Sequence, residues 1–507
     1  MRGAGKWSIL AILSFALALI SLDNTIVNVA LPSLQEDLKA TSAQLQWVVD
    51  AYSVLFAGTL LLAGSLGDRF GRKKVLLIGL VIFGAGSLAA GAAPDADVLI
   101  ACRALMGIGG AFIMPSTLSI LVQTFTAPTE RAQAIGIWAA VAGVGVAIGP
   151  IVGGALLEHF SWHSVFLVNP PLVLIVLGLA IAFIPESLDA SKPRLDVRGA
   201  ALSSLGLIAL VTFIVELPDS GLTVTTVLAG LAALMLLASF VWWENRAPRP
   251  LLPMTLFKER LFTVAVVLVG LVYFALMGAL FFLPQFLQLV QGMTPLESGV
   301  SMLPGAGGLL VASLFSPRLA EKWGARLVVV TGVLLVTAGL LSMSFVEPMT
   351  SYAYVGFALG ITGIGMGLTL PQATNGVLSC VPRERSGMGS AVNDAVSELG
   401  GSFGVAILGG ILAFFYRSRI DETLSAAPDA ASDIPEQVLS TVRESLAAAS
   451  VLIEQLPGAL AAPAREIVAA AFVTGMGWAL VTGAAITLLG AVLAWLFFPQ
   501  RMERVEE

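Results

Sequence analysis

The sequence is poor in charge, cysteine and histidine. Only 12% of its 507 residues are charged, whereas soluble domains carry about 25%. Cys102 and Cys380 are too few and too far apart for a disulfide framework, and the two histidines add no clustered set of metal ligands. No GxxxxGKS or GxxxxGKT loop occurs, which argues against ATP coupling. We therefore expect no enzyme active site, no bound cofactor or metal, and no nucleic-acid partner.

The residues that are present are mostly apolar. The chain is 57% hydrophobic, with a mean hydropathy of +0.91. Apolar runs of about 20 residues, enough to cross about 30 Å of hydrocarbon, recur from end to end. These runs predict an all-α polytopic membrane protein. Its fourteen spans are expected at 8–31, 46–66, 75–93, 98–121, 133–157, 165–184, 199–217, 223–243, 263–289, 298–316, 327–346, 352–378, 387–414 and 467–498.

The loop charges predict the orientation of these spans. An even number of spans puts both termini on one side of the membrane, and most of the 27 Lys and Arg residues lie in loops on that side. The positive-inside rule makes it the cytoplasmic side. The basic start and the apolar run that follows it are similar to a signal peptide. The run continues into polar residues without a small-x-small cleavage site, however, so we interpret it as the first span.

A loop motif occurs twice, about half the chain apart. GSLGDRFGRKK follows the second predicted span, and SPRLAEKWGARLVVVTG follows the tenth. Aligning Gly71 with Gly324 pairs Asp68 with Glu321. A parallel repeat of six-helix halves is a transporter architecture, with the substrate site near the midplane between the halves. We predict a first half at 1–190, two linker helices and a loop at 191–262, and a second half at 263–507.

Five motifs, in order and at matching spans, resemble those of the major facilitator superfamily, and closely those of its fourteen-span drug:proton antiporters. They are LDNTIVNVALP at 22–32, GSLGDRFGRKK at 64–74, LIACRALMGIGGA at 99–111, GVGVAIGPIVGG at 143–154 and WHSVFLVNPP at 162–171. The resemblance covers nearly the whole chain and is closest to quaternary-ammonium and multidrug efflux transporters. The last motif departs from the family pattern, because His163 replaces the usual arginine.

The resemblance implies conformational roles for two of these motifs. We interpret the loop motif as a cytoplasmic gate, with simple topogenesis as the alternative, and Asp68 in it can face a helix N-terminus or a basic partner. The fifth-helix motif implies a hinge that favours exchange over leak. The gate residues are Gly64, Asp68, Arg69, Gly71 and Arg72, and the hinge residues are Gly145, Gly149, Pro150, Gly153 and Gly154.

Two opposite charges lie at matching depth in the predicted first and fourth spans. Asp23 is about eight residues, or about 12 Å, below the outer end of its span, and Arg103 is about five residues, or about 8 Å, below the same face. An arginine side chain can cover the difference. A pair between them would offset the cost of burying either charge. Its role is either proton coupling or purely structural.

The thirteenth span carries two acids. Asp394 and Glu398 are four residues apart and therefore share one helical face. Two carboxylates so placed repel each other when both are ionised, so protonation of one is favoured. Such a pair suits proton coupling and attracts a cation. It is also similar to the quaternary-ammonium and dication exporters of the fourteen-span group, and Asp50 fits the same subgroup.

Aromatic and methionine side chains can complete a cation pocket, because π-faces attract cations and methionine adapts its shape. Packing against lipid or protein is the alternative for each. The candidates are Asn28, Tyr52, Trp138, Tyr273, Met277, Phe281 and Phe282. Between the last two spans, the outer loop at 416–466 contains an apolar spacing near 3.6 residues, which predicts an amphipathic helix or helical hairpin.

These features together predict a proton-coupled multidrug efflux antiporter. We expect it to export lipophilic, cationic compounds by alternating access, as a monomer in the bacterial cytoplasmic membrane, driven by the proton gradient. A dedicated exporter of one endogenous metabolite, antibiotic or lipid on the same fold is the main alternative. The membrane acids and the fifth-helix motif count against a uniporter or importer of a neutral nutrient. A membrane sensor or scaffold is a further alternative, and it would need no proton path.

Overall fold

The computed structural model describes residues 5–188, 195–426, 442–443, 446–454 and 458–500. These residues form helices and contain no β-strand. In the first half and the linker the helices are α1 (Lys6–Leu38), α2 (Ser42–Phe70), α3 (Arg72–Ala90), α4 (Ala96–Thr124), α5 (Pro128–His159), α6 (His163–Leu167), α7 (Asn169–Phe183), α8 (Val197–Ser220), α9 (Val224–Glu244) and η1 (Met254–Lys258). In the second half they are α10 (Arg260–Gln285), η2 (Phe286–Val290), α11 (Pro295–Val300), α12 (Leu303–Trp323), α13 (Ala325–Ser344), α14 (Tyr352–Ser379), η3 (Arg383–Arg385), α15 (Ser386–Ala426), α18 (Leu446–Glu454) and α19 (Gly458–Phe497).

Thirteen helical segments of the described residues are long and apolar enough to cross a membrane. The remaining predicted span corresponds to α5, in which some side chains lie outside the description. Two predicted spans are broken into a short and a long helix. The sixth is α6 followed by α7, and the tenth is α11 followed by α12. The all-helical prediction is therefore confirmed, with shifts in the helix bounds.

The repeated loop motif has the same geometry in both halves. Gly71 and Gly324 separate two consecutive helices with φ angles of 114° and 90°, which a residue with a Cβ rarely adopts. The backbone N–H that follows each glycine donates to the chain beyond the last helix of its own half. Arg72 N donates to Ser187 O, and Ala325 N donates to Gln500 O, both at 2.9 Å. The sequence repeat is thus a structural repeat.

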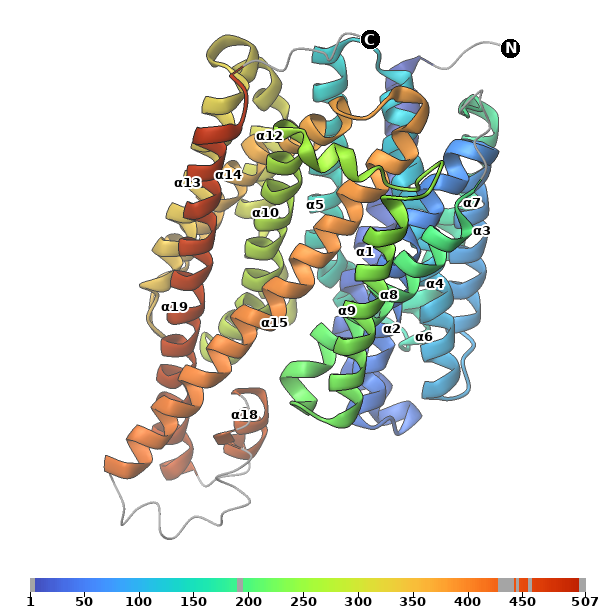
Figure 1. The fold of residues 1–507 in the computed structure, drawn as a ribbon. Coiled ribbons are helices and arrows are strands. Elements are labelled where there is room, and N and C mark those ends of the chain that lie inside the picture. The colour runs from blue at the N-terminus through green and yellow to red at the C-terminus, as the bar shows by residue number, and fades with distance from the viewer. Residues whose placement is uncertain (1–4, 189–194, 427–441, 444–445, 455–457, 501–507) are drawn as a thin grey trace.

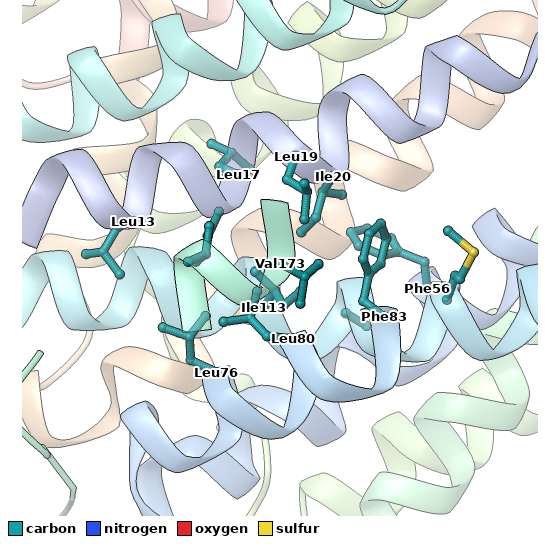
Figure 2. Close-up of a cluster of buried hydrophobic side chains, with 14 of the residues drawn as sticks. Leu13, Leu17, Leu19, Ile20, Phe56, Leu76, Leu80, Phe83, Ile113 and Val173 are labelled. Carbon is teal, nitrogen blue, oxygen red and sulfur yellow. The ribbon is translucent and has the colours of Figure 1, made fainter. Parts of the chain in front are cut away.

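The buried apolar side chains largely follow the two predicted halves. One cluster is drawn from residues 9–184, with Leu378 and Ala395 of the second half joining it. Figure 2 shows part of this cluster, where side chains of α1, α2, α3, α4 and α7 meet. A second cluster is drawn from residues 272–484, with Ala140 of the first half. These shared members lie on α5, α14 and α15, so these helices take part in the contact between the halves.

The inserted pair, α8 and α9, runs along the outside of the bundle, at the front of the view in Figure 1. Val211 of α8 packs with Val54 and Ala57 of α2, and Leu399 of α15 packs against the same group. One inserted helix therefore contacts both halves along the α2–α15 seam. By contrast, α9 turns most of its surface outward, including Leu228, Leu234 and Trp242.

Both ends of the described chain lie at one face of the bundle, which we call the terminus face (Figure 1). Lys6, near the start of α1, forms an ion pair of 2.5 Å with Glu130 at the start of α5. At the opposite face, α15 and α19 extend beyond the predicted spans, and α18 lies beside them. Tyr416 Oη donates to Val442 O there at 2.8 Å. Part of the predicted outer hairpin is therefore helical, while its residues 427–441 lie outside the described residues.

Candidate functional site

The predicted ion pair in the first half is present. Arg103 Nη1 on α4 lies 2.6 Å from Asp23 Oδ2 on α1, and both side chains are at most 1% exposed. Arg103 Nε also donates to Val48 O at 3.0 Å. Its guanidinium lies 4.6 Å from the centre of the Tyr52 ring. Each buried charge thus has an opposite charge and further polar partners, as buried ions require.

Asn169 is a second partner of Asp23 that the sequence reasoning missed. It is the first residue of α7 and is fully buried. Its Nδ2 donates to Asp23 Oδ1 at 2.7 Å and to Ser87 Oγ on α3 at 3.0 Å. Ser87 Oγ in turn donates to Phe166 O at 2.8 Å. A continuous polar network therefore joins α1, α3, α4, α6 and α7 around one carboxylate.

The acids of the thirteenth span lie on α15. Asp394 is 1% exposed, and its Oδ1 accepts a hydrogen bond of 3.1 Å from Asn393 Nδ2. Its Oδ2 and the Asn393 Oδ1 have no hydrogen-bond donor. Glu398 is half-buried one turn further along the helix. Next to it, Leu399 meets α2 and α8, so this part of α15 faces the seam between the halves.

A second buried ion pair occupies the repeated loop motif. Arg72 Nη2 lies 2.7 Å from Asp68 Oδ1, and both side chains are at most 5% exposed. Asp68 also accepts from the backbone N–H groups of Gly387 and Met388, at 2.9 and 3.0 Å. These groups lie at the start of α15, where an anion is favoured by the helix dipole. Both predicted kinds of partner for Asp68, a helix N-terminus and a cation, are therefore present together.

Close backbone contact accompanies these bonds. A Cβ on Gly64 would overlap the carbonyl oxygen of Gly387. Arg72 Nη2 also donates to Glu384 O at 2.7 Å, again across the halves. Arg69 takes a different position, with its guanidinium 5.1 Å from the Phe70 ring.

Further contacts join the halves at the terminus face. Arg383 Nη2 donates to Thr126 O at 2.8 Å, and Thr129 Oγ1 donates to Glu321. Glu321, the repeat partner of Asp68, thus reaches the start of α5 as Asp68 reaches the start of α15. Arg131 Nε, on α5 and 8% exposed, donates to Asn375 Oδ1 on α14 at 3.0 Å. The terminus face is therefore closed in this conformation.

The fifth-helix glycines mostly face α1. A Cβ on Gly145 would lie 2.8 Å from Ser21 Cβ, and one on Gly153 would lie 2.9 Å from Ile26 Cγ1. A Cβ on Gly149 would overlap Thr25 Oγ1, whereas Gly154 has nothing within 4 Å of its added Cβ. Close packing of α5 on α1 thus depends on three of the four glycines. The Pro150 side chain lies outside the described residues.

The predicted cavity residues do not form one group. Tyr52 and Trp138 are buried, and Trp138 Nε1 donates to Thr117 Oγ1 at 3.1 Å. Met277 packs on Gly401 and Phe281 on Gly409, both on α15. The other positions range from buried to exposed: Phe282 is buried, Tyr273 and Asp50 are half-buried, and Asn28 is exposed on α1.

The sequence profile described as Major Facilitator Superfamily matches residues 13–405. The chain belongs to the major facilitator superfamily. It is 37% identical over 432 residues to the multidrug efflux pump LfrA of Mycolicibacterium smegmatis, which covers 85% of this chain and 86% of that protein. It is 33% identical over 420 residues to the methyl viologen resistance protein SmvA of Salmonella typhimurium, covering 82% of this chain and 84% of that one.

A solved structure supports the fold of this facilitator. The human organic anion transporter MFSD10 superposes with a TM-score of 0.65 at 14% identity, covering 97% of this chain and 100% of that chain. At this identity the likeness concerns the fold alone. The family recognised from the sequence motifs is thus confirmed, and it is a family of multi-pass membrane transporters and not of enzymes.

Proposed function

We propose that this facilitator is a proton-coupled multidrug efflux antiporter that exports lipophilic cations by alternating access. Relatives at 33–37% identity are named for multidrug efflux and for resistance to methyl viologen, which is itself a dication. The observation that carries the proposal is Asp394, whose Oδ2 is buried in a spanning helix without a hydrogen-bond donor. A carboxyl in that position needs either a proton or a positively charged partner.

In this proposal the α15 acids and the Asp23–Arg103 pair have different roles. Asp394 and Glu398 are the sites that bind a cation or protons in turn, because they share a face of α15 near the seam between the halves. Asp50, on α2 and half-buried, adds negative charge near the outer end of the path. The Asp23–Arg103 pair couples protonation to movement of the first half, because its members lie on different helices, α1 and α4.

The closed terminus face is the cytoplasmic gate in this proposal. Asp68 and Arg72 hold the start of α15 against α2, and Gly64 permits the close approach of the two backbones. With the termini on the cytoplasmic side of a bacterial cytoplasmic membrane, the conformation described here is closed to the cytoplasm. Opening must break the Asp68 bonds to α15. In this proposal the glycines and Pro150 of the α5 motif are the hinge, at the place where α5 packs closely on α1.

The cavity in this proposal is lined by different residues in different states. Asn28 is exposed on α1, and a polar side chain in a span faces water or protein rather than lipid. Met277 and Phe281 line the α10 side of α15 and are adaptable contacts for a lipophilic cation. Tyr52 supports Arg103 in this conformation, and Trp138 is held by Thr117.

The alternative function is export of one endogenous metabolite, antibiotic or lipid. The two acids of α15 favour the multidrug antiporter, because a dedicated exporter of a neutral molecule has less need of both Asp394 and Glu398. The two functions differ in substrate range, so a panel of chemically unrelated cations separates them.

The test is transport by the full-length protein in proteoliposomes. Ethidium, tetraphenylphosphonium and methyl viologen are added with and without an imposed pH difference. We expect uptake of all three that depends on the pH difference and is lost in Asp394→Asn/Glu398→Gln. Transport of one compound only would favour the dedicated exporter, and transport that ignores the pH difference would refute proton coupling.

A further inference from the structure

Asn169 sits where the first-half ion pair meets a second set of polar groups. Its Nδ2 contacts both Asp23 and Ser87, as described above. Its Oδ1 is buried and has no hydrogen-bond donor. An unpaired buried acceptor in an otherwise satisfied network is uncommon. The Asn169 amide therefore has an unused acceptor, and rotation about its Cβ–Cγ bond would bring that acceptor to the Asp23 carboxylate.

The two ends of an amide suit the two forms of a carboxyl group. An ionised carboxylate only accepts hydrogen bonds, so it needs the Nδ2 donor of Asn169. A protonated carboxyl also donates, and it can donate to the Oδ1 acceptor. Turning the Asn169 amide by about 180° exchanges these two ends at Asp23. The side chain can therefore satisfy Asp23 in either form.

Ser87 is compatible with both orientations. In the structure its hydroxyl accepts from Asn169 Nδ2 and donates to Phe166 O. After the amide turns, the same hydroxyl can rotate and donate to Asn169 Oδ1, because a hydroxyl has one donor and two acceptor sites. The contacts that join Asp23, Asn169 and Ser87 can therefore be made in both orientations of the amide.

The other side chain that hydrogen-bonds to Asp23 in the described residues, Arg103, does not offer this choice. Arg103 on α4 is a permanent donor. Tyr52 on α2 lies under Arg103, and its hydroxyl has no hydrogen-bond partner and so makes no hydrogen bond to Asp23. The α5 glycines at positions 145, 149 and 153 face Ser21, Thr25 and Ile26 of α1. In the described part of the first half, Asn169 is therefore the group suited to distinguish the two forms of Asp23.

We propose that Asn169 is a positioning residue that senses the protonation state of Asp23 by turning its amide. The inference rests on the proposed proton-coupled function. With Asp23 ionised, Asn169 ties α7 and α3 to the ion pair through Nδ2. With Asp23 protonated, the pair with Arg103 weakens, and the turned amide keeps α7 attached to α1. Asn169 thereby keeps the first half assembled while the charge on Asp23 changes.

The experiment measures proton release on binding of tetraphenylphosphonium to the detergent-solubilised full chain, over a series of pH values. Asn169→Leu keeps the side-chain size but removes the donor that favours ionised Asp23. The substitution removes the hydrogen bond to ionised Asp23 and also the one that protonated Asp23 would donate. The first is the stronger, because it involves a charged group. We therefore expect the midpoint of proton release to move up by about one pH unit. Ser87→Ala removes one hydrogen bond of the Asn169 amide, and it should move the midpoint of proton release upward by a smaller amount.

The controls separate a structural role from the proposed one. Ser14→Ala removes a buried α1 hydroxyl that has no hydrogen-bond partner, and it should leave the midpoint unchanged. If Asn169→Leu and Ser87→Ala lower the binding capacity but keep the wild-type midpoint, Asn169 is only structural and the inference is wrong. If Asp23→Asn itself keeps the wild-type proton release, then the role of Asp23 in the proposed function fails instead.

Discussion

Asp68 of α2 and Met388 of α15 are joined by a hydrogen bond of 3.0 Å between a carboxylate oxygen and a backbone N–H. The two residues belong to different halves and are 320 positions apart in the chain. The bond therefore exists only while the terminus face is closed. Since an anion at a helix N-terminus also gains from the helix dipole, Asp68 stabilises that closed form.

Asp68→Asn should open the terminus face. A hydrogen bond to a charged group contributes about 1.5–3 kcal/mol, so its loss changes the open population by about tenfold or more. The measurement is the maleimide labelling rate of Ser390→Cys, since Ser390 is fully buried in the closed form. We expect at least tenfold faster labelling with Asp68→Asn. Glu347→Gln, an exposed acid at the opposite face, is the control, and equal rates in both variants would contradict the gate.

Two glycines of the α5 motif, Gly149 and Gly154, should respond differently to substitution by alanine. Gly149→Ala places a methyl group on Thr25, whereas Gly154→Ala places one in open space. Overpacking of this kind costs about 1–3 kcal/mol. We expect a lower Tm of the purified protein and reduced export for Gly149→Ala only. Thermal unfolding of both variants checks this, and equal stability would mean that the α1–α5 contact is looser than described.

The α15 acids should separate substrates by charge. Each charge that crosses the membrane involves about 2.3 kcal/mol per 100 mV, so a dication needs two protons in return for an exchange that is neutral overall. Asp394→Asn should therefore spare ethidium and lose methyl viologen, whereas Glu398→Gln should impair both. Paired transport of the two dyes at a fixed pH difference measures this. Equal losses of both dyes in Asp394→Asn would rule out a division of labour between the acids.

The orientation can be tested by cysteine labelling in intact cells. Ser425→Cys at the exposed end of α15 should react with an impermeant maleimide from outside, and Lys74→Cys only after the cells are made permeable. The native cysteines give a low background, because Cys102 is buried and burial raises the pKa of the Cys380 thiol to about 11; the thiolate is the reactive form. The reverse labelling pattern would invert the topology.

Local sequence patterns predicted much of the site. The depths of Asp23 and Arg103 in their spans were enough to predict the ion pair, because two antiparallel helices bring equal depths together. The repeat of Gly71 at Gly324 was visible as a motif, because both positions need the same backbone turn. Helix ends were less well predicted, since α15 and α19 continue past the apolar runs into the outer hairpin.

Contacts between distant helices could not be read from the sequence. Asn169 stands inside a recognised motif, yet its contact with Asp23 depends on how α7 packs against α1 and α3. The partner of Asp68 was predicted as a helix N-terminus, but not as that of α15. Arg131 and Asn375 likewise carry no local signal of their pairing. These are consequences of three-dimensional packing, which spacing along one helix does not contain.

The position of α8 across the α2–α15 seam bears on how such a chain acquires extra spans. In water, uncovering Val54, Ala57 and Leu399 would carry a hydrophobic cost. In a bilayer the same surface would simply meet lipid tails, which are as apolar as the helix that they replace. Adding or losing α8 and α9 therefore changes packing more than solvation. A helix pair can therefore be added to a transporter of twelve helices with a small change in free energy, because lipid and helix cover the same apolar surface about equally well.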